Sequence, residues 1–126
     1  MSGQRRGEPV DAAAPPTGTP AARAGAGLTV RPLDGRAGVR VAGEIGLATR
    51  AAWESLLERV LHEGEDVYCL ELSEVAFADV AGATALAVAA QRLDARRRIV
   101  LHRPPAALRR TLEAFWPGLR AIEVTT

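Results

Sequence analysis

Two short segments near residue 30 carry the residue pattern of β-strands. In Gly38–Ile45, Val39 and Val41 alternate with polar or small residues, which is the period of a half-buried strand. Leu28–Leu33 precedes it across a turn-rich stretch, so the two segments predict a hairpin. Pro32 has no N–H group to donate to a neighbouring strand, and this places the first strand at an edge of the sheet.

The period changes to that of a helix at Thr49, which we expect to act as the N-cap. Large apolar residues then recur at i, i+3, i+4, i+7 and i+8, on one helical stripe: Trp53, Leu56, Leu57, Val60 and Leu61. After this helix, Val67–Leu72 is apolar at nearly every position. That pattern is typical of an interior strand with both faces covered.

The next predicted helix, Ala81–Arg98, is rich in alanine, and its last turn holds Arg96, Arg97 and Arg98, which complement the helix dipole. Three further elements follow: a buried strand at Ile99–Leu101, a helix opened by Pro104–Pro105 and closed by Pro117–Gly118, and an edge strand at Leu119–Val124. The resulting order, ββαβαβαβ, predicts an α/β fold. Its strand–helix–strand units imply parallel neighbours joined by right-handed crossovers.

Residues 1–27 have a different composition from the rest of the chain. They hold four of the eight prolines and many alanines and glycines, but only Met1 and Val10 as sizeable apolar side chains. Such a segment buries too little apolar surface to offset the entropy of ordering, so we expect a disordered tail before a single domain at 28–126. No apolar stretch follows Arg5 and Arg6, as a secretory signal would require.

The composition and charge of the chain argue against several classes of protein. The 126 residues carry a formal charge of only +1, which argues against a protein built to coat nucleic acid or an anionic membrane. The longest apolar run, Ala81–Ala90, is about half the length that a bilayer requires, so no membrane insertion is expected. Cys69 is the one cysteine, which excludes an internal disulfide, and it is interpreted as a small core residue.

Catalytic motifs are not recognised in the sequence. His62 and His102 lie forty residues apart and have no ligand spacing to each other or to Cys69, so no metal site is predicted. No serine lies in a nucleophile elbow, and the glycines of Gly43–Gly46 match no phosphate-binding loop. We therefore expect a non-enzymatic protein without a cofactor.

The junction between the central strand and the alanine-rich helix carries a recognisable motif. Asp79 stands where an N-cap is expected, and Gly82 in the first turn permits close approach. The stretch Leu70–Gly82 resembles the signature "L-x-L-S-x-V-x-F-x-D-S-S/T-G" of STAS domains, the fold of anti-sigma-factor antagonists. Upstream, Val41–Thr49 is similar to the family's "V-x-G-E-L-D-x-x-T". The resemblance covers Leu28–Val124 and implies a mixed sheet with helices packed mainly on one face.

This sequence departs from the family pattern at the switch itself. In family antagonists, a partner kinase phosphorylates the serine directly after the aspartate. Val80 occupies that position and Ala81 follows, so the resemblance implies a degenerate phosphosite and a surface that stays uncharged. Gly46 replaces an acidic residue of the family. Thr84, one helical turn after Val80, is an alternative acceptor, although a hydroxyl bonded to its own helix is the favoured interpretation.

The resemblance implies a cytoplasmic interaction module that docks on a histidine-kinase-like ATPase anti-sigma factor and thereby regulates transcription. The partner-binding residues would be Gly43, Glu44, Gly46, Asp79, Val80, Ala81, Gly82 and Thr84. The alternative is a structural or regulatory STAS subunit of a transporter ATPase or a signalling assembly, which a lost phosphosite suits equally well. Nucleotide binding is disfavoured by the missing phosphate loop. A homo-oligomer stays open, since Trp116 could be an exposed anchor or part of the core.

Overall fold

A computed structural model of the chain describes residues 22–25, 27–63 and 65–126. These residues form a six-stranded sheet in the order β2-β3-β4-β5-β6-β7. The strands are β2 (Ala22–Gly25), β3 (Leu28–Pro32), β4 (Gly38–Ile45), β5 (Val67–Ala78), β6 (Arg98–His102) and β7 (Ile122–Thr125). The first three pair antiparallel, whereas β4, β5, β6 and β7 pair parallel. The predicted α/β class with a mixed sheet is confirmed.

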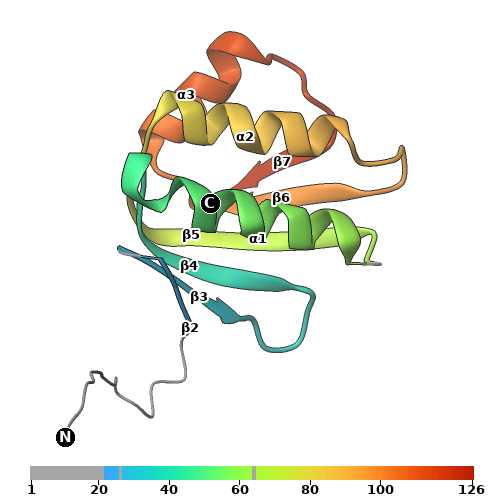
Figure 1. The fold of residues 1–126 in the computed structure, drawn as a ribbon. Coiled ribbons are helices and arrows are strands. Elements are labelled where there is room, and N and C mark those ends of the chain that lie inside the picture. The colour runs from blue at the N-terminus through green and yellow to red at the C-terminus, as the bar shows by residue number, and fades with distance from the viewer. Residues whose placement is uncertain (1–21, 26, 64) are drawn as a thin grey trace, which may run out of the picture.

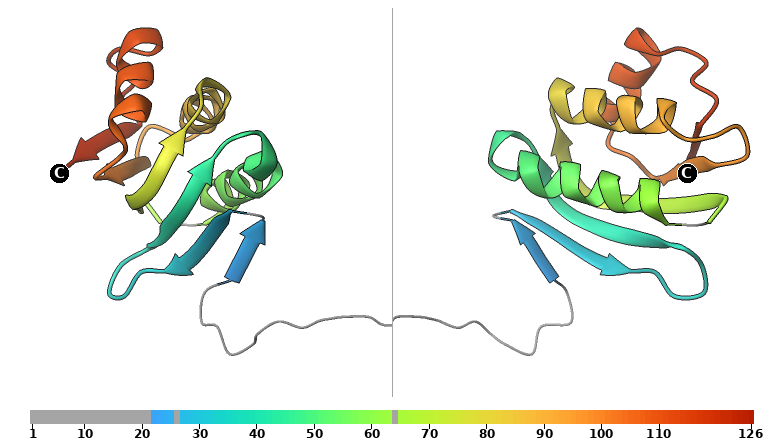
Figure 2. Two further views of the ribbon diagram at one scale, coloured as in Figure 1. Left: turned by 90° about the vertical axis from the view of Figure 1, so that its left-hand side faces the viewer. Right: turned by 45° about the vertical axis from the view of Figure 1, so that its right-hand side comes forward.

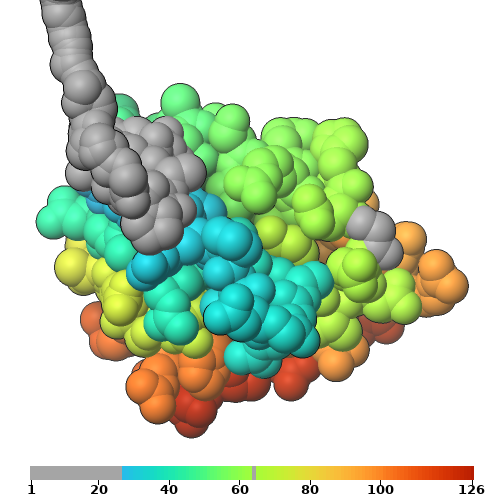
Figure 3. Space-filling model, turned by 90° about the horizontal axis from the view of Figure 1, so that it is seen from below, coloured from blue at the N-terminus to red at the C-terminus, as the bar shows by residue number. Residues whose placement is uncertain are grey.

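Three helices connect the parallel strands: α1 (Arg50–His62), α2 (Val80–Gln91) and α3 (Ala106–Phe115). All three cover the same face of the sheet, with α2 between α1 and α3 (Figures 1 and 2). The apolar stripe predicted for α1 faces the sheet, and Trp53 and Val60 are fully buried there. Side chains from both layers form one core, the largest being Trp53, Leu28, Ile45, Leu70, Leu72, Leu86, Ile99, Leu101 and Leu108. Viewed from below, the β3–β4 hairpin (cyan) lies between α1 (green) and the C-terminal segments (Figure 3).

The N-terminal boundary differs from the prediction. Ala22–Gly25, which the sequence places in the tail, forms strand β2 and pairs with β3, Ala22 opposite Val30. A backbone ladder needs no large side chains, so apolar content could not reveal this strand. β3 is therefore not the edge, but in the part of β2 that the structure describes the pairing does not reach Pro32. Residues 1–21 of the predicted tail lie outside the described residues.

One helix boundary and one strand boundary also differ. The helix predicted for Ala81–Arg98 ends at Gln91, because Asp94 forms a turn in which its Oδ1 accepts the N–H of Arg96 at 3.1 Å. Arg98 begins β6, so the three arginines do not belong to α2. The strand predicted for Val67–Leu72 continues to Ala78, next to the start of α2. The helix after Pro105 is confirmed, and so is an edge strand at the C-terminus, although β7 begins at Ile122 and not at the predicted Leu119.

Candidate functional site

The carboxyl ends of β4 and β5 lie side by side and bring together the two segments of the recognised motif. Ile45 pairs with Ala78, and the N–H of Asp79 donates to the Ile45 carbonyl at 2.9 Å. The chain leaves β4 through the 3₁₀ turn η2 (Leu47–Thr49) and leaves β5 directly into α2. Loops at the carboxyl ends of parallel strands are where α/β folds place their binding sites. We call this surface, made of residues 44–50 and 77–84, the sheet-end surface.

Asp79 organises the sheet-end surface, as its predicted role of N-cap requires. Its Oδ1 accepts the N–H of Gly82 at 2.7 Å, which satisfies a free donor of the first turn of α2. Its Oδ2 accepts from Nη2 of Arg50 at 3.3 Å, and this ion pair links α2 to the start of α1. The carboxylate is therefore occupied on both sides and serves to position the turn.

Gly82 is a buried residue of the second of these segments, 77–84, and is not accessible to a partner. A Cβ atom at Gly82 would stand 2.5 Å from Cγ2 of Ile45, so the glycine allows α2 to pack closely on β4. Its carbonyl accepts a hydrogen bond at 3.0 Å from Nε1 of Trp53, which is fully buried on α1. Because Gly82 is buried, its place in the motif reflects packing.

Gly43 and Gly46 also shape the loop before α1. Gly43 has φ +119 and lies against the carbonyl of Gly27, where a Cβ atom would collide. The N–H of Gly46 donates to Oγ1 of Thr49 at 3.0 Å, and that hydroxyl donates to the Glu44 carbonyl at 2.7 Å. Thr49 therefore closes its own loop. The prediction that its side chain caps α1 is wrong.

Apart from Glu44, the exposed part of the sheet-end surface is apolar. Val80, where the motif resemblance places the family's phosphorylated serine, is 58% exposed, and Leu47 at the tip of the neighbouring turn is 85% exposed. Phe77, the partner of Glu44 across the strands, is 49% exposed. Ala81 and Thr84 are half-buried beside them. An apolar group at each of these positions gains free energy when a partner covers it.

The hydroxyl of Thr84 is already engaged. It donates to the carbonyl of Val80 at 2.9 Å within α2, as the favoured interpretation predicted. Sequence reasoning missed the exposure of Leu47 and the Arg50–Asp79 ion pair. The exposure of Leu47 could have been predicted, because it is a large apolar residue in a loop and outside the helical stripe. The ion pair of Arg50 could not have been predicted, since its partner Asp79 lies 29 residues away in the sequence.

The remaining candidate residues serve structural roles. Cys69 is buried at 2% exposure, and burial raises the pKa of its thiol, so it is a poor nucleophile. Nδ1 of His102 lies 2.8 Å from Oγ1 of Thr125, and Nδ1 of His62 lies 2.8 Å from the Glu58 carbonyl. In residues 22–25, 27–63 and 65–126, no three His, Cys, Asp or Glu side chains gather in a way that could hold a metal ion. No helix in these ranges has the length and apolar character to cross a membrane.

Comparison with known families agrees with this geometry. The family model described as "Mlab, STAS domain" matches residues 28–116, which include the whole sheet-end surface. The chain belongs to the STAS-domain family. This match confirms the family resemblance that the two motif segments carried.

Two solved structures are similar to this STAS chain. An anti-sigma factor antagonist from Mycobacterium paratuberculosis is 25% identical, with a TM-score of 0.62 over 78% of this chain and 83% of the other. The anti-sigma factor antagonist SpoIIAA in its unphosphorylated form is 16% identical, with a TM-score of 0.55 over 79% and 88%. The second likeness concerns the fold alone. No curated protein sequence matches the chain.

Proposed function

We propose that this STAS chain is a non-catalytic regulatory module that docks through its sheet-end surface on a kinase-like ATPase anti-sigma factor in the cytoplasm. Such docking would release a sigma factor and permit transcription. The observation that carries the proposal is the exposed apolar pair Val80 and Leu47 at the carboxyl ends of β4 and β5. The similarity to an anti-sigma factor antagonist supports the choice of partner.

Docking in this protein would not be switched off by phosphorylation at the usual position. Val80 has no hydroxyl, and the nearest hydroxyl on α2, that of Thr84, is bonded to the Val80 carbonyl. Phosphorylation at a docking surface acts by adding about two negative charges, which repel and must be desolvated. Without an acceptor at Val80, the surface stays competent. Of the predicted partner-binding residues, Val80, Ala81, Thr84 and Glu44 would touch the partner, while Gly43, Gly46, Asp79 and Gly82 would hold the surface in shape.

A second function is favoured by the same valine. A docking surface that cannot be phosphorylated also suits a permanent subunit of a transporter ATPase or a signalling assembly. The two functions differ in lifetime and in partner. A permanent subunit would co-purify at equal stoichiometry under all growth conditions, whereas an antagonist would form a reversible complex.

The test is affinity capture from a cell extract of the source organism, with bound proteins identified by mass spectrometry. We expect Val80→Asp and Leu47→Asp each to weaken capture at least about tenfold, since an added carboxylate must be desolvated on binding and 1.4 kcal/mol is a factor of ten. Val67→Asp is the matched control, because Val67 is a 40% exposed valine at the opposite end of β5. Capture that is insensitive to both sheet-end changes would refute the proposed surface. An ATPase of a transporter among the captured proteins would select the second function.

A further inference from the structure

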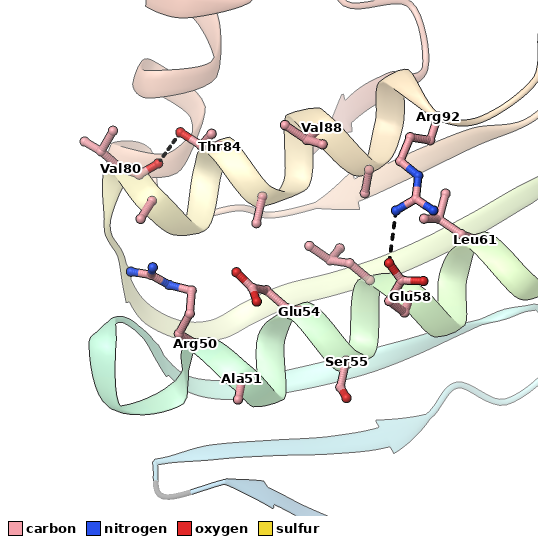
Figure 4. Close-up of a pocket in the computed structure, with 14 residues that line it drawn as sticks. Arg50, Ala51, Glu54, Ser55, Glu58, Leu61, Val80, Thr84, Val88 and Arg92 are labelled. Carbon is pink, nitrogen blue, oxygen red and sulfur yellow. Dashed lines mark hydrogen bonds and ion pairs between the residues drawn. The ribbon is translucent and has the colours of Figure 1, made fainter.

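A groove runs along the outer side of the molecule between α1 and α2. It has a volume of about 1040 Å³ and is open to solvent, and Figure 4 shows it in close-up. Pockets for small ligands usually measure about 300–1,000 Å³, so this volume is large for a small molecule. The groove begins at Val80 on the sheet-end surface and continues to Arg92, just after α2.

The floor and one wall of the groove are apolar. Small residues of α2 at i, i+4 and i+8, Ala81, Ala85 and Ala89, leave room between the helices, and Leu57 and Leu61 of α1 complete the floor. Val80 and Val88 of α2 remain 58% and 48% exposed. Burying these valines and the floor would supply the hydrophobic part of a binding free energy.

Charged side chains of α1 form the other wall, and one carboxylate there has no partner among the described residues. Arg50 at one end pairs with Asp79 at 3.3 Å, and Arg92 at the other end pairs with Glu58 at 3.0 Å. Glu54 lies midway, one turn from Arg50 and from Glu58, and its carboxylate points toward α2 (Figure 4). Among the described residues, no ion pair or hydrogen bond engages the Glu54 side chain. The centre of the groove therefore carries a net negative charge above an apolar floor.

We propose that a helix of the protein partner, with an apolar face and one lysine or arginine, docks in this groove with its cation beside Glu54. The inference rests on the proposed function, because the groove continues the sheet-end surface through Val80 and Ala81. A helix fits because a ridge of side chains packs into the furrow between two helices. Residues 80–91 of α2 span about 17 Å, which would accommodate about three turns of such a helix.

The experiment places an apolar photo-crosslinking residue at Val88, an exposed position of α2 that lines the groove, in the full chain. Crosslinking in cells of the source organism, followed by mass spectrometry, identifies the partner segment. We expect a helical segment with a lysine or arginine. Glu54→Arg should lower the crosslink yield at least about tenfold, and Glu54→Gln less. Glu113→Arg on α3 is the control, since it makes the same charge change on an exposed residue outside the groove.

Charge reversal of the crosslinked lysine or arginine in the partner should restore binding to Glu54→Arg, which would support the proposal directly. Crosslinks to a second copy of this chain, or to a segment without a cation, would overturn it. If capture stays sensitive to Val80→Asp but indifferent to Glu54→Arg, the groove proposal fails and the proposed function stands. If capture is indifferent to both, the two fail together.

Discussion

Trp53 connects α1 to the first turn of α2 through one buried hydrogen bond. Its indole is fully buried, and Nε1 donates to the Gly82 carbonyl at 3.0 Å. We expect Trp53→Phe to lower the free energy of unfolding by about 2–3 kcal/mol, since it removes that bond and leaves a cavity. Urea denaturation followed by the fluorescence of the remaining Trp116 measures the loss.

Trp116→Phe is the matched control, because Trp116 is only half-buried at the end of α3 and the chain has two tryptophans. Trp116→Phe should lower the free energy of unfolding clearly less than Trp53→Phe does, and the fluorescence of Trp53 follows its unfolding. Equal losses for the two variants would show that the Trp53–Gly82 bond contributes nothing. Because the bond holds the start of α2, Trp53→Phe should also weaken partner capture.

At the scale of single residues, the sequence predicted the chemistry of local contacts better than that of distant ones. Asp79 was predicted to cap α2 and does so, because an N-cap bond spans only three residues. Thr49 was predicted to cap α1, but two backbone groups of its own loop compete for its hydroxyl. Arg50 could not be assigned to the site, since only the packed sheet brings it to Asp79.

At the scale of elements, Arg97 stabilises a helix other than the one predicted. The sequence assigned it to the last turn of α2, but it reaches across to the end of α1. Its guanidinium donates to the carbonyls of Val60 at 2.7 Å, Leu61 at 2.9 Å, Glu63 at 2.6 Å and Glu65 at 3.1 Å. Arg97 therefore does complement a helix C-terminus, but that of α1 and not the predicted one of α2.

We expect Arg97→Ala to lower the free energy of unfolding by about 1–3 kcal/mol, because it leaves several carbonyls at the end of α1 without this donor. Arg97→Lys should be intermediate, since an ammonium cannot reproduce the planar fork. Arg96→Ala is the control within the same run, because its side chain is exposed and only its backbone N–H bonds Asp94. Thermal melts of the four proteins test this, and equal melting temperatures for the Arg96 and Arg97 variants would contradict it.

The order of elements from Leu28 onward was predictable because apolar residues recur with the period of the helix or strand whose face is buried. The apolar stripe of α1 and the continuous apolar run of β5 both identify elements that the core encloses. β2 was not predictable, because its pairing with β3 uses backbone groups that every residue has. The predicted end of α2 lay too far along the chain. Alanines and arginines favour a helix, but a turn at Asp94 follows α2 and redirects the chain.

At the scale of the whole molecule, a row of polar side chains crosses the face of the sheet that the helices leave uncovered. Arg40, Glu71, His102 and Thr125 are neighbours in register on β4, β5, β6 and β7. Their sequence neighbours Val39, Leu70 and Leu101 face the core, so alternation directs the row to the opposite face. Nε2 of His102 lies 3.6 Å from Oε1 of Glu71, whose side chain is 10% exposed.

Glu71 makes this row sensitive to acid. Burial alone would raise the pKa of its carboxyl, but hydrogen bonds from Ser73 and attraction to His102 and Arg40 together lower it below the usual value. A carboxyl whose pKa is lower in the folded chain stabilises the fold above its unfolded pKa of about 4.3. That contribution is lost as the pH falls through the folded pKa.

Urea unfolding of wild type and Glu71→Gln between pH 7 and pH 3 tests this. We expect the wild type to be the more stable at pH 7 and the difference to shrink below about pH 4.3, since the amide has no charge to lose. Glu113→Gln, on an exposed residue of α3, should follow the wild type throughout. A constant difference between wild type and Glu71→Gln at every pH would mean that the ionised carboxylate does not stabilise the sheet. The row would then be a solvated surface rather than a connection between the four parallel strands.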